Sequence, residues 1–234
     1  MRKIDPEGVW EDFEDQLDEQ SRYYRSSWNT LASAADRKIA TENYALTIGV
    51  MFEGYINDLI FAYANRDCSR VMQHLENSVR ETLAAIPKAE AAFNKFAEFK
   101  HRDHLTRSEL KAILDPEGRN TSFPNFVAIE DRAQQWLAEQ HRSKFTGLNA
   151  QQRAVINAVI ATRNNLAHRS KGSLDRLNDA FNAGALYPTG LQRNVNRIQQ
   201  AGHYLKAKHP PNSPETRATI MGRLLKDAAE SIVH

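Results

Sequence analysis

The chain has a single cysteine, Cys68, among its 234 residues. One thiol cannot close an intramolecular disulfide or supply the paired cysteines of a structural zinc site, and this scarcity is typical of a reducing compartment. Glycine (10) and proline (8) are also few, which argues against a disordered chain and a turn-rich all-β protein. The composition predicts a globular, cytoplasmic protein.

The motifs of the common enzyme classes are missing too. The sequence has no glycine-rich phosphate loop, no HExxH zinc motif and no GxSxG nucleophile elbow. Two histidines, His101 and His104, flank an arginine and an aspartate, but no further ligands of a metal shell can be identified, so we interpret this segment as a solvated loop. We therefore expect neither a metal nor a cofactor.

Long uninterrupted apolar runs are absent as well. Charged residues recur every two or three positions near the N-terminus, so we expect no secretion signal. The most apolar window, Tyr44 to Tyr63, contains Glu53, Asn57 and Asp58. Because a charge at the bilayer centre costs ~3 kcal/mol, this window favours a buried helix over a membrane span.

The charge that is present is unevenly distributed, although the formal net charge is only +2. Eight acidic residues and no basic one lie between Asp5 and Glu19. Between His141 and Arg176, by contrast, seven Lys and Arg residues accompany one acidic residue, Asp175. The basic stretch is therefore where we expect an anionic ligand.

Apolar residues recur at helical spacing along most of the chain, and no segment shows the alternation of a strand. Capping signals mark several helix starts, such as Asp5 with Pro6, Thr106 with Glu109, and Asn149 with Gln152. The pattern predicts an all-α protein. We expect helices over residues 6–31, from Thr41 after a break at 35–40, from about 67–69 with an interruption at Pro87, over LKAIL, over 126–140, from 150 to about Lys171, over Leu191–Lys206, and from Ser213.

The segment ATRNNLAHRS, residues 161–170, places polar chemistry at the end of an apolar helix. Asn164 and His168 are four residues apart and share a helix face, while the long side chain of Arg163 can reach the same volume. A guanidinium that binds phosphate and an imidazole that titrates near neutrality are a minimal set for cleaving RNA without a metal. Spacing alone equally allows Arg163 and His168 to be cations that stabilise a helix end.

These residues resemble the HEPN superfamily, whose Rx4-6H motif Arg163 to His168 matches in its RNxxxH form, with an alanine before the histidine. The segment VMFEGYINDLI is similar to the early HEPN helix in which a glutamate, here Glu53, lies among aromatic and aliphatic residues. The resemblance covers about residues 41–206 and is closest to the RiboL-PSP-HEPN branch. It implies an up-and-down helical bundle over 41–206, with an extra acidic N-terminal helix in 1–40 and a linker and short helix in 207–234.

The resemblance also implies an activity. HEPN nucleases are metal-independent endoribonucleases in which the ribose 2′-hydroxyl attacks the phosphorus and leaves 2′,3′-cyclic phosphate and 5′-hydroxyl ends. Arg163 would bind the phosphoryl oxygens, His168 would transfer a proton, and Asn164 would orient the histidine or the phosphate. Glu53 would hold Arg163, although a solvated helix carboxylate is an equal alternative. Arg169 and Lys171 are candidates for contacts with the RNA backbone, although a charged helix end is the simpler account of them.

The resemblance further implies a homodimer with a composite active site, and we expect the dimer to bury the apolar stripe that precedes Arg163. Toxin or defence effectors are common in such families, so an antitoxin or regulatory protein is a candidate partner besides RNA. Two alternatives remain open. One is a non-catalytic HEPN-type module that binds RNA or another protein, and the other is a structural helical adaptor that docks through its terminal helices.

Overall fold

The computed structural model describes residues 3–118 and 121–234. Within these ranges every element is helical, which confirms the predicted all-α fold, and one isolated β-bridge joins Lys208 and Thr216. The helices are α1 (Pro6–Thr30), α2 (Ala34–Arg66), α3 (Ser69–Ala84), α4 (Pro87–Phe96), α5 (Arg107–Leu114), α6 (Phe126–Trp136), α7 (Glu139–Thr146), α8 (Ala150–His168), α9 (Lys171–Ala180), the 3-10 helix η1 (Gly184–Thr189), α10 (Ala201–Lys206) and α11 (Arg217–Glu230).

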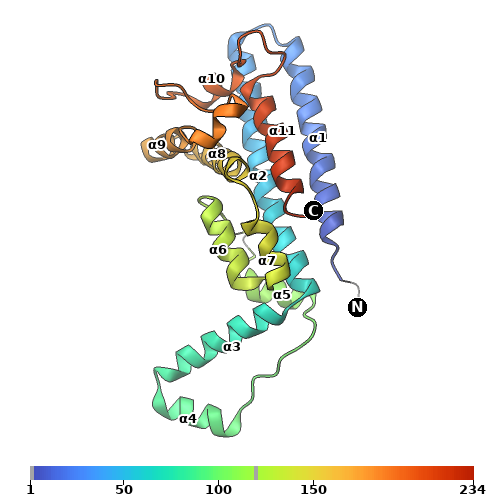
Figure 1. The fold of residues 1–234 in the computed structure, drawn as a ribbon, viewed down its shortest axis with the longest axis vertical. Helices are drawn as coiled ribbons and strands as arrows, with labels where there is room; N and C mark the ends of the chain where they lie inside the picture. Colours follow the sequence, from blue (N-terminus) through green and yellow to red (C-terminus); the bar gives the residue numbers. More distant parts are fainter. Residues whose placement is uncertain (1–2, 119–120) are drawn as a thin grey trace.

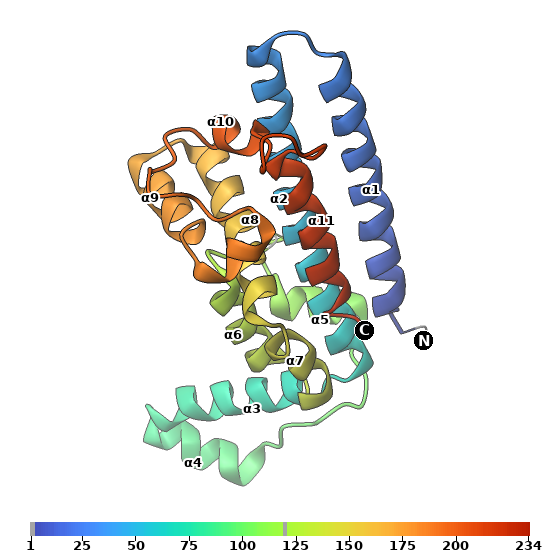
Figure 2. The ribbon, with the colours of Figure 1, turned by 45° about the horizontal axis from the view of Figure 1, so that its top comes forward.

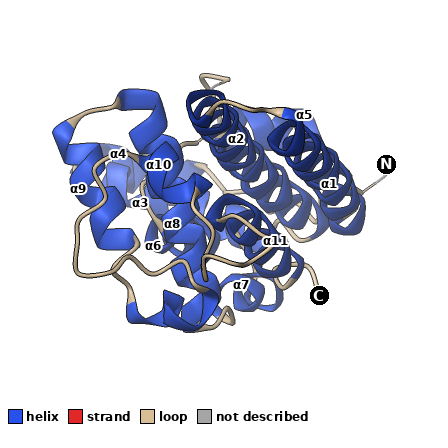
Figure 3. Cartoon of the chain, turned by 90° about the horizontal axis from the view of Figure 1, so that it is seen from above, coloured by secondary structure: helices blue, strands red, loops and turns tan. Residues whose placement is uncertain are grey.

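The 33-residue helix α2 is the centre of the fold (Figure 1). It contacts α1 on one side and α8 and α10 on the other, with α11 beside them (Figure 3). By length and composition alone α2 could cross a membrane, but 56% of its most apolar window is buried inside the protein. Its apolar face therefore forms the core of the bundle. This agrees with the prediction of a buried helix, which is based on Glu53, Asn57 and Asp58 within the apolar window.

Both terminal helices belong to that core. Phe13 of α1 stacks on Tyr55 of α2 with ring centroids 4.5 Å apart, and Ile220 and Leu225 of α11 are buried. The acidic face of α1 meets Lys226 of α11, whose Nζ lies 2.9 Å from Glu14 and 2.8 Å from Asp18. The C-terminal helix thus docks on the body of its own chain.

The break predicted at residues 35–40 is wrong, because α2 begins at Ala34. The hydroxyl of Ser33 caps the helix by accepting from the backbone N–H groups of Ala35 and Asp36. Only residues 31–33 separate α1 from α2, so the expected boundary between 1–40 and 41–206 falls inside a helix.

A helical hairpin of α3 and α4 projects from the base of the bundle (Figure 2). The chain turns just before Pro87, which is the first residue of α4, so the predicted interruption is confirmed. Beyond it, the capping box of Thr106 and Glu109 starts α5 as predicted. The helix expected over 126–140 is instead α6 followed by α7, because Leu137 adopts an extended conformation with its side chain buried.

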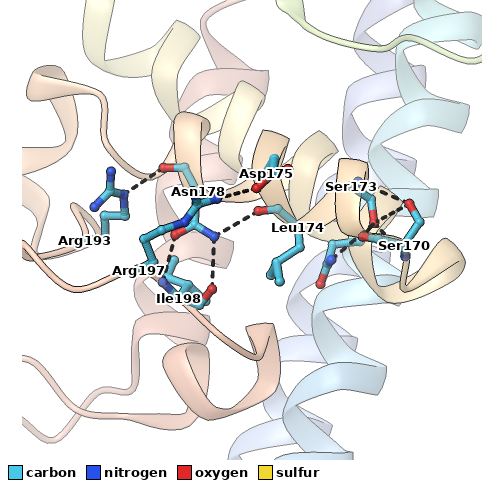
Figure 4. Close-up of polar contacts among 9 residues, drawn as sticks. Ser170, Ser173, Leu174, Asp175, Asn178, Arg193, Arg197 and Ile198 are labelled. Carbon is cyan, nitrogen blue, oxygen red and sulfur yellow. Dashed lines mark hydrogen bonds and ion pairs between the residues drawn. The ribbon is translucent and has the colours of Figure 1, made fainter.

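The predicted capping box of Asn149 and Gln152 does start α8, but this helix ends at His168, before Lys171. The helix expected over Leu191–Lys206 is also wrong, since only its last six residues form α10. The buried side chain of Asn178 explains this. Its amide donates to the carbonyl of Ile198 and its oxygen accepts from the N–H of Ile198, which holds residues 191–200 in an irregular path (Figure 4).

Candidate functional site

Two of the residues singled out by the sequence, Glu53 of α2 and Arg163 of α8, meet where α8 crosses α2. At this crossing Gly49 of α2 faces Arg163 of α8, and a Cβ built on Gly49 would lie 2.6 Å from the Arg163 Cβ. Only a glycine permits this close approach. The sequence alone does not reveal this role of Gly49, because the residue lies inside a helical pattern without a turn signal. The approach brings the polar end of α8 against the middle of α2.

Glu53 lies one turn after Gly49 and binds the arginine directly. Its Oε2 accepts from Arg163 Nη2 at 2.6 Å, and the two side chains are 17% and 23% exposed. The predicted pairing is therefore present. A carboxylate so placed fixes the orientation of the planar guanidinium, because charge-assisted bonds to arginine are strongly directional.

The same carboxylate also anchors the segment that leads into α6. Glu53 Oε1 accepts from the backbone N–H of Phe123 at 3.2 Å. One turn further along α2, Asn57 accepts from the N–H of Thr121 and donates to its carbonyl, at 3.2 and 2.9 Å. The segment thus packs beside the arginine. Asn57 was visible in the sequence only as an amide within an apolar window.

Asn164 bonds with its neighbour, accepting from Arg163 Nη1 at 2.8 Å. Among the described residues it has no bond to His168. A guanidinium carries five N–H donors. With Glu53 and Asn164 bound, the Nε–H and one N–H on each terminal nitrogen of Arg163 have no acceptor within the described ranges.

His168 is the last residue of α8 and is exposed. Within the described part of the chain its ring makes no hydrogen bond or ion pair. It lies one helical turn after Asn164, so both side chains project from the same face of α8. The imidazole is therefore free to meet a ligand or a second protein surface.

Arg169 ends α8 in a left-handed conformation, with φ 48° and ψ 27°. This conformation costs a non-glycine residue ~1 kcal/mol, and glycine or asparagine is preferred at such helix ends. The arginine Nη2 lies 3.2 Å from Oε2 of Glu42 on α2. Lys171, the first residue of α9, is exposed and has no ion pair among the residues described.

The apolar stripe that precedes Arg163 is buried inside the chain itself. Ile156 is fully buried and Ile160 is 9% exposed. The expectation that a dimer would bury this stripe is therefore wrong, because α2, α6 and α11 already cover α8. Exposed apolar side chains of α2 include Ile39, which is 55% exposed, and Val50, which directly follows Gly49 and is 50% exposed.

The histidines of residues 101–104 form no metal centre in this structure. His101 Nε2 lies 2.7 Å from Glu76, and both ring nitrogens of His104 are buried without a partner among the described residues. Across residues 3–118 and 121–234, no group of three or more His, Cys, Asp and Glu side chains could hold a metal ion.

Taken as chemistry, the site combines an anchored guanidinium with an unbonded imidazole at one end of one helix. Such a pair can bind an anion and transfer a proton beside it. Comparison with protein-family models, curated proteins and solved structures finds no significant match. The assignment of the site therefore depends on its own residues.

Proposed function

We propose that this protein is a metal-independent endoribonuclease of the HEPN type. The observation that carries the proposal is the position of Arg163, whose guanidinium binds Glu53 at 2.6 Å and keeps N–H donors without an acceptor among the described residues. It lies in the last turns of the same helix that ends at the exposed His168. The surrounding cations Arg169 and Lys171 suit an RNA backbone, whose phosphates dominate binding.

In the proposed reaction the ribose 2′-oxygen attacks the adjacent phosphorus. The P–O2′ bond forms as the P–O5′ bond breaks, which leaves a 2′,3′-cyclic phosphate and a 5′-hydroxyl. His168 acts either as the base that accepts the proton of the attacking 2′-hydroxyl or as the acid that donates a proton to the leaving 5′-oxygen. Arg163 donates to the phosphoryl oxygens, where negative charge grows in the transition state. Glu53 positions the arginine and does not contact the substrate.

A homodimer with a composite site is part of the proposal. One arginine and one histidine are few groups for phosphodiester cleavage, and a two-fold axis beside the RNxxxH segment would supply a second pair. Val50, adjacent to Gly49 at the helix crossing, offers an exposed apolar contact for such an interface. We expect Val50→Lys to convert the dimer to a monomer in analytical ultracentrifugation and to reduce cleavage with it.

The test is cleavage of mixed cellular RNA in the presence of a chelator. We expect wild-type protein to cleave, and Arg163→Ala and His168→Ala to lose at least about 100-fold in rate, as is typical for a general acid or base. His203→Ala is the matched control, because His203 is another exposed histidine, on α10. Cleavage that requires a metal, or that persists unchanged in His168→Ala, would refute the proposal.

A non-catalytic RNA-binding or protein-interaction module is the second candidate. The observation in its favour is that Arg163 already has two partners within the chain, while His168 has none among the described residues. In that case His168→Ala would leave RNA binding and any cellular effect intact. A toxin or defence role, with an antitoxin or regulatory partner, predicts instead that toxicity on expression disappears with His168→Ala.

A further inference from the structure

A groove of about 290 Å³ lies at the C-terminal end of α8, directly beside the RNxxxH segment. Three cations from separate positions line it: Lys38 of α2, Arg169 at the end of α8, and Lys171 at the start of α9. A single carboxylate, Glu42, lies among them. The groove therefore has a surplus of positive charge at the end of the helix that carries the proposed catalytic residues.

Glu42 pairs with two of these cations, Lys38 and Arg169. Its carboxylate lies 3.6 Å from Lys38 Nζ and 3.2 Å from Arg169 Nη2, and its side chain is only 14% exposed. It packs so closely on α10 that a Cβ built on Gly202 would lie 2.4 Å from Oε1. The Arg169 side chain, in contrast, is 72% exposed, so most of its donors face solvent.

The backbone at Arg169 is strained for an arginine. Among the described residues it is the one non-glycine residue with positive φ, at a helix end where glycine would be free of strain. Its ion pair with Glu42 is largely solvent-exposed on the arginine side, and such pairs contribute little to stability. Folding alone therefore favours glycine over arginine at this position.

Gln199 and Gln200 form another part of the groove lining. These amides directly follow Ile198, whose backbone N–H and carbonyl are both bonded to the buried Asn178, at 2.8 and 3.0 Å (Figure 4). Asn178 thereby fixes the path of the chain that carries them. Both glutamine side chains are exposed and can donate to phosphate or ribose oxygens.

We propose that this groove binds a phosphate of single-stranded RNA that neighbours the scissile phosphate. Arg169, Lys38 and Lys171 contact the phosphate oxygens, and Gln199 and Gln200 contact the backbone beside it. This inference rests on the proposed nuclease function, since the groove continues the helix end that carries Arg163 and His168. It assigns to Lys38, which is far away in sequence, a direct part in substrate binding.

The test measures RNA binding in a His168→Ala background, so that the RNA stays intact. The probe is a fluorescein-labelled single-stranded RNA of mixed sequence and 20 nucleotides, titrated by anisotropy at several salt concentrations in chelator. Arg169→Gly is the main variant, because it removes the guanidinium and also relieves the left-handed strain. Lys38→Gln is the second variant, and Arg22→Ala is the control for loss of one exposed charge elsewhere.

We expect Arg169→Gly to bind ~5-fold more weakly at low salt and to lower the salt slope by about 0.7, as for one lost single-strand phosphate contact. Its melting temperature should equal or exceed that of the parent. If Arg169→Gly bound RNA as tightly as the control Arg22→Ala, the proposed role of the groove would be refuted. If wild-type protein binds RNA without cleaving it and Arg169→Gly weakens binding, the nuclease proposal fails while the groove stands. Absence of RNA binding at low salt would overturn both.

Discussion

The crossing of α2 and α8 allows a paired test on one helix, with Gly49→Ala and Gly54→Ala. A Cβ at Gly49 would lie 2.6 Å from Arg163 Cβ and 3.1 Å from its Cγ, whereas at Gly54 nothing lies within 4 Å. Ordinary contacts of this kind begin near 3.4 Å, so Gly49→Ala must push the two helices about 1 Å apart. Because Arg163 sits on the displaced helix, its bond to Glu53 should weaken as well.

The two substitutions should change the free energy of unfolding in opposite directions. Overpacking of this kind costs about 1–3 kcal/mol, whereas replacing an open helical glycine with alanine gains up to ~1 kcal/mol. We therefore expect the free energies of unfolding of the two variants to differ by about 1–4 kcal/mol, or roughly 2–16 °C in Tm for a chain of this size. Urea denaturation followed by circular dichroism measures the difference, and Gly49→Ala should also lose RNA cleavage.

A double-mutant cycle sharpens this prediction. Arg163→Ala retains the Cβ that causes the 2.6 Å contact, while Arg163→Gly removes it. Gly49→Ala should therefore be compensated in part by Arg163→Gly and hardly at all by Arg163→Ala. If Gly49→Ala were as stable as Gly54→Ala, or if both arginine variants compensated it equally, the close crossing would be refuted.

Three further predictions concern the surroundings of the site. Glu53→Gln keeps an acceptor for the Phe123 N–H but removes the charge opposite Arg163, so we expect a loss of about 1–2 kcal/mol in urea denaturation and slower RNA cleavage. Asn178→Ala leaves both backbone groups of Ile198 without their partner, so it should cost about 2–4 kcal/mol and speed proteolysis within residues 191–200, whereas the exposed Asn182→Ala should do neither. Burial lowers the pKa of His141, which stacks on Tyr63. Because the unfolded chain then takes up the proton first, stability should fall as the pH drops through about 6.5, and His141→Phe should flatten that dependence in denaturation curves at pH 5–7.

Local signals in the sequence predicted the parts of the fold that depend on neighbouring residues. The all-α class, the capping boxes at Thr106 and Asn149 and the interruption at Pro87 all follow from spacing and capping chemistry. Residues 191–200 were wrongly expected to be helical, because a helix-compatible pattern there is overridden by the distant amide of Asn178. Tertiary hydrogen bonds of this kind leave no periodic trace in the sequence.

In the candidate site, too, local signals predicted some residues, whereas tertiary contacts determine the role of others. Arg163, Asn164 and His168 could be selected from their spacing and family resemblance, and the pairing of Glu53 with Arg163 was expected from the resemblance. Gly49 and Asn57 could not be selected, since their importance lies in a close helix approach and in bonds to a segment 64 residues away. Lys38 was missed for the same reason, because only the fold brings it to Arg169 and Lys171.

The most direct test of the central claim is an end-group analysis of RNA incubated with the protein in chelator. Attack by the 2′-hydroxyl under the action of Arg163 and His168 predicts 2′,3′-cyclic phosphate and 5′-hydroxyl termini from wild-type protein, and no such products from His168→Ala. Products with 5′-phosphate and 3′-hydroxyl ends, or cyclic phosphates formed equally by His168→Ala, would contradict the account.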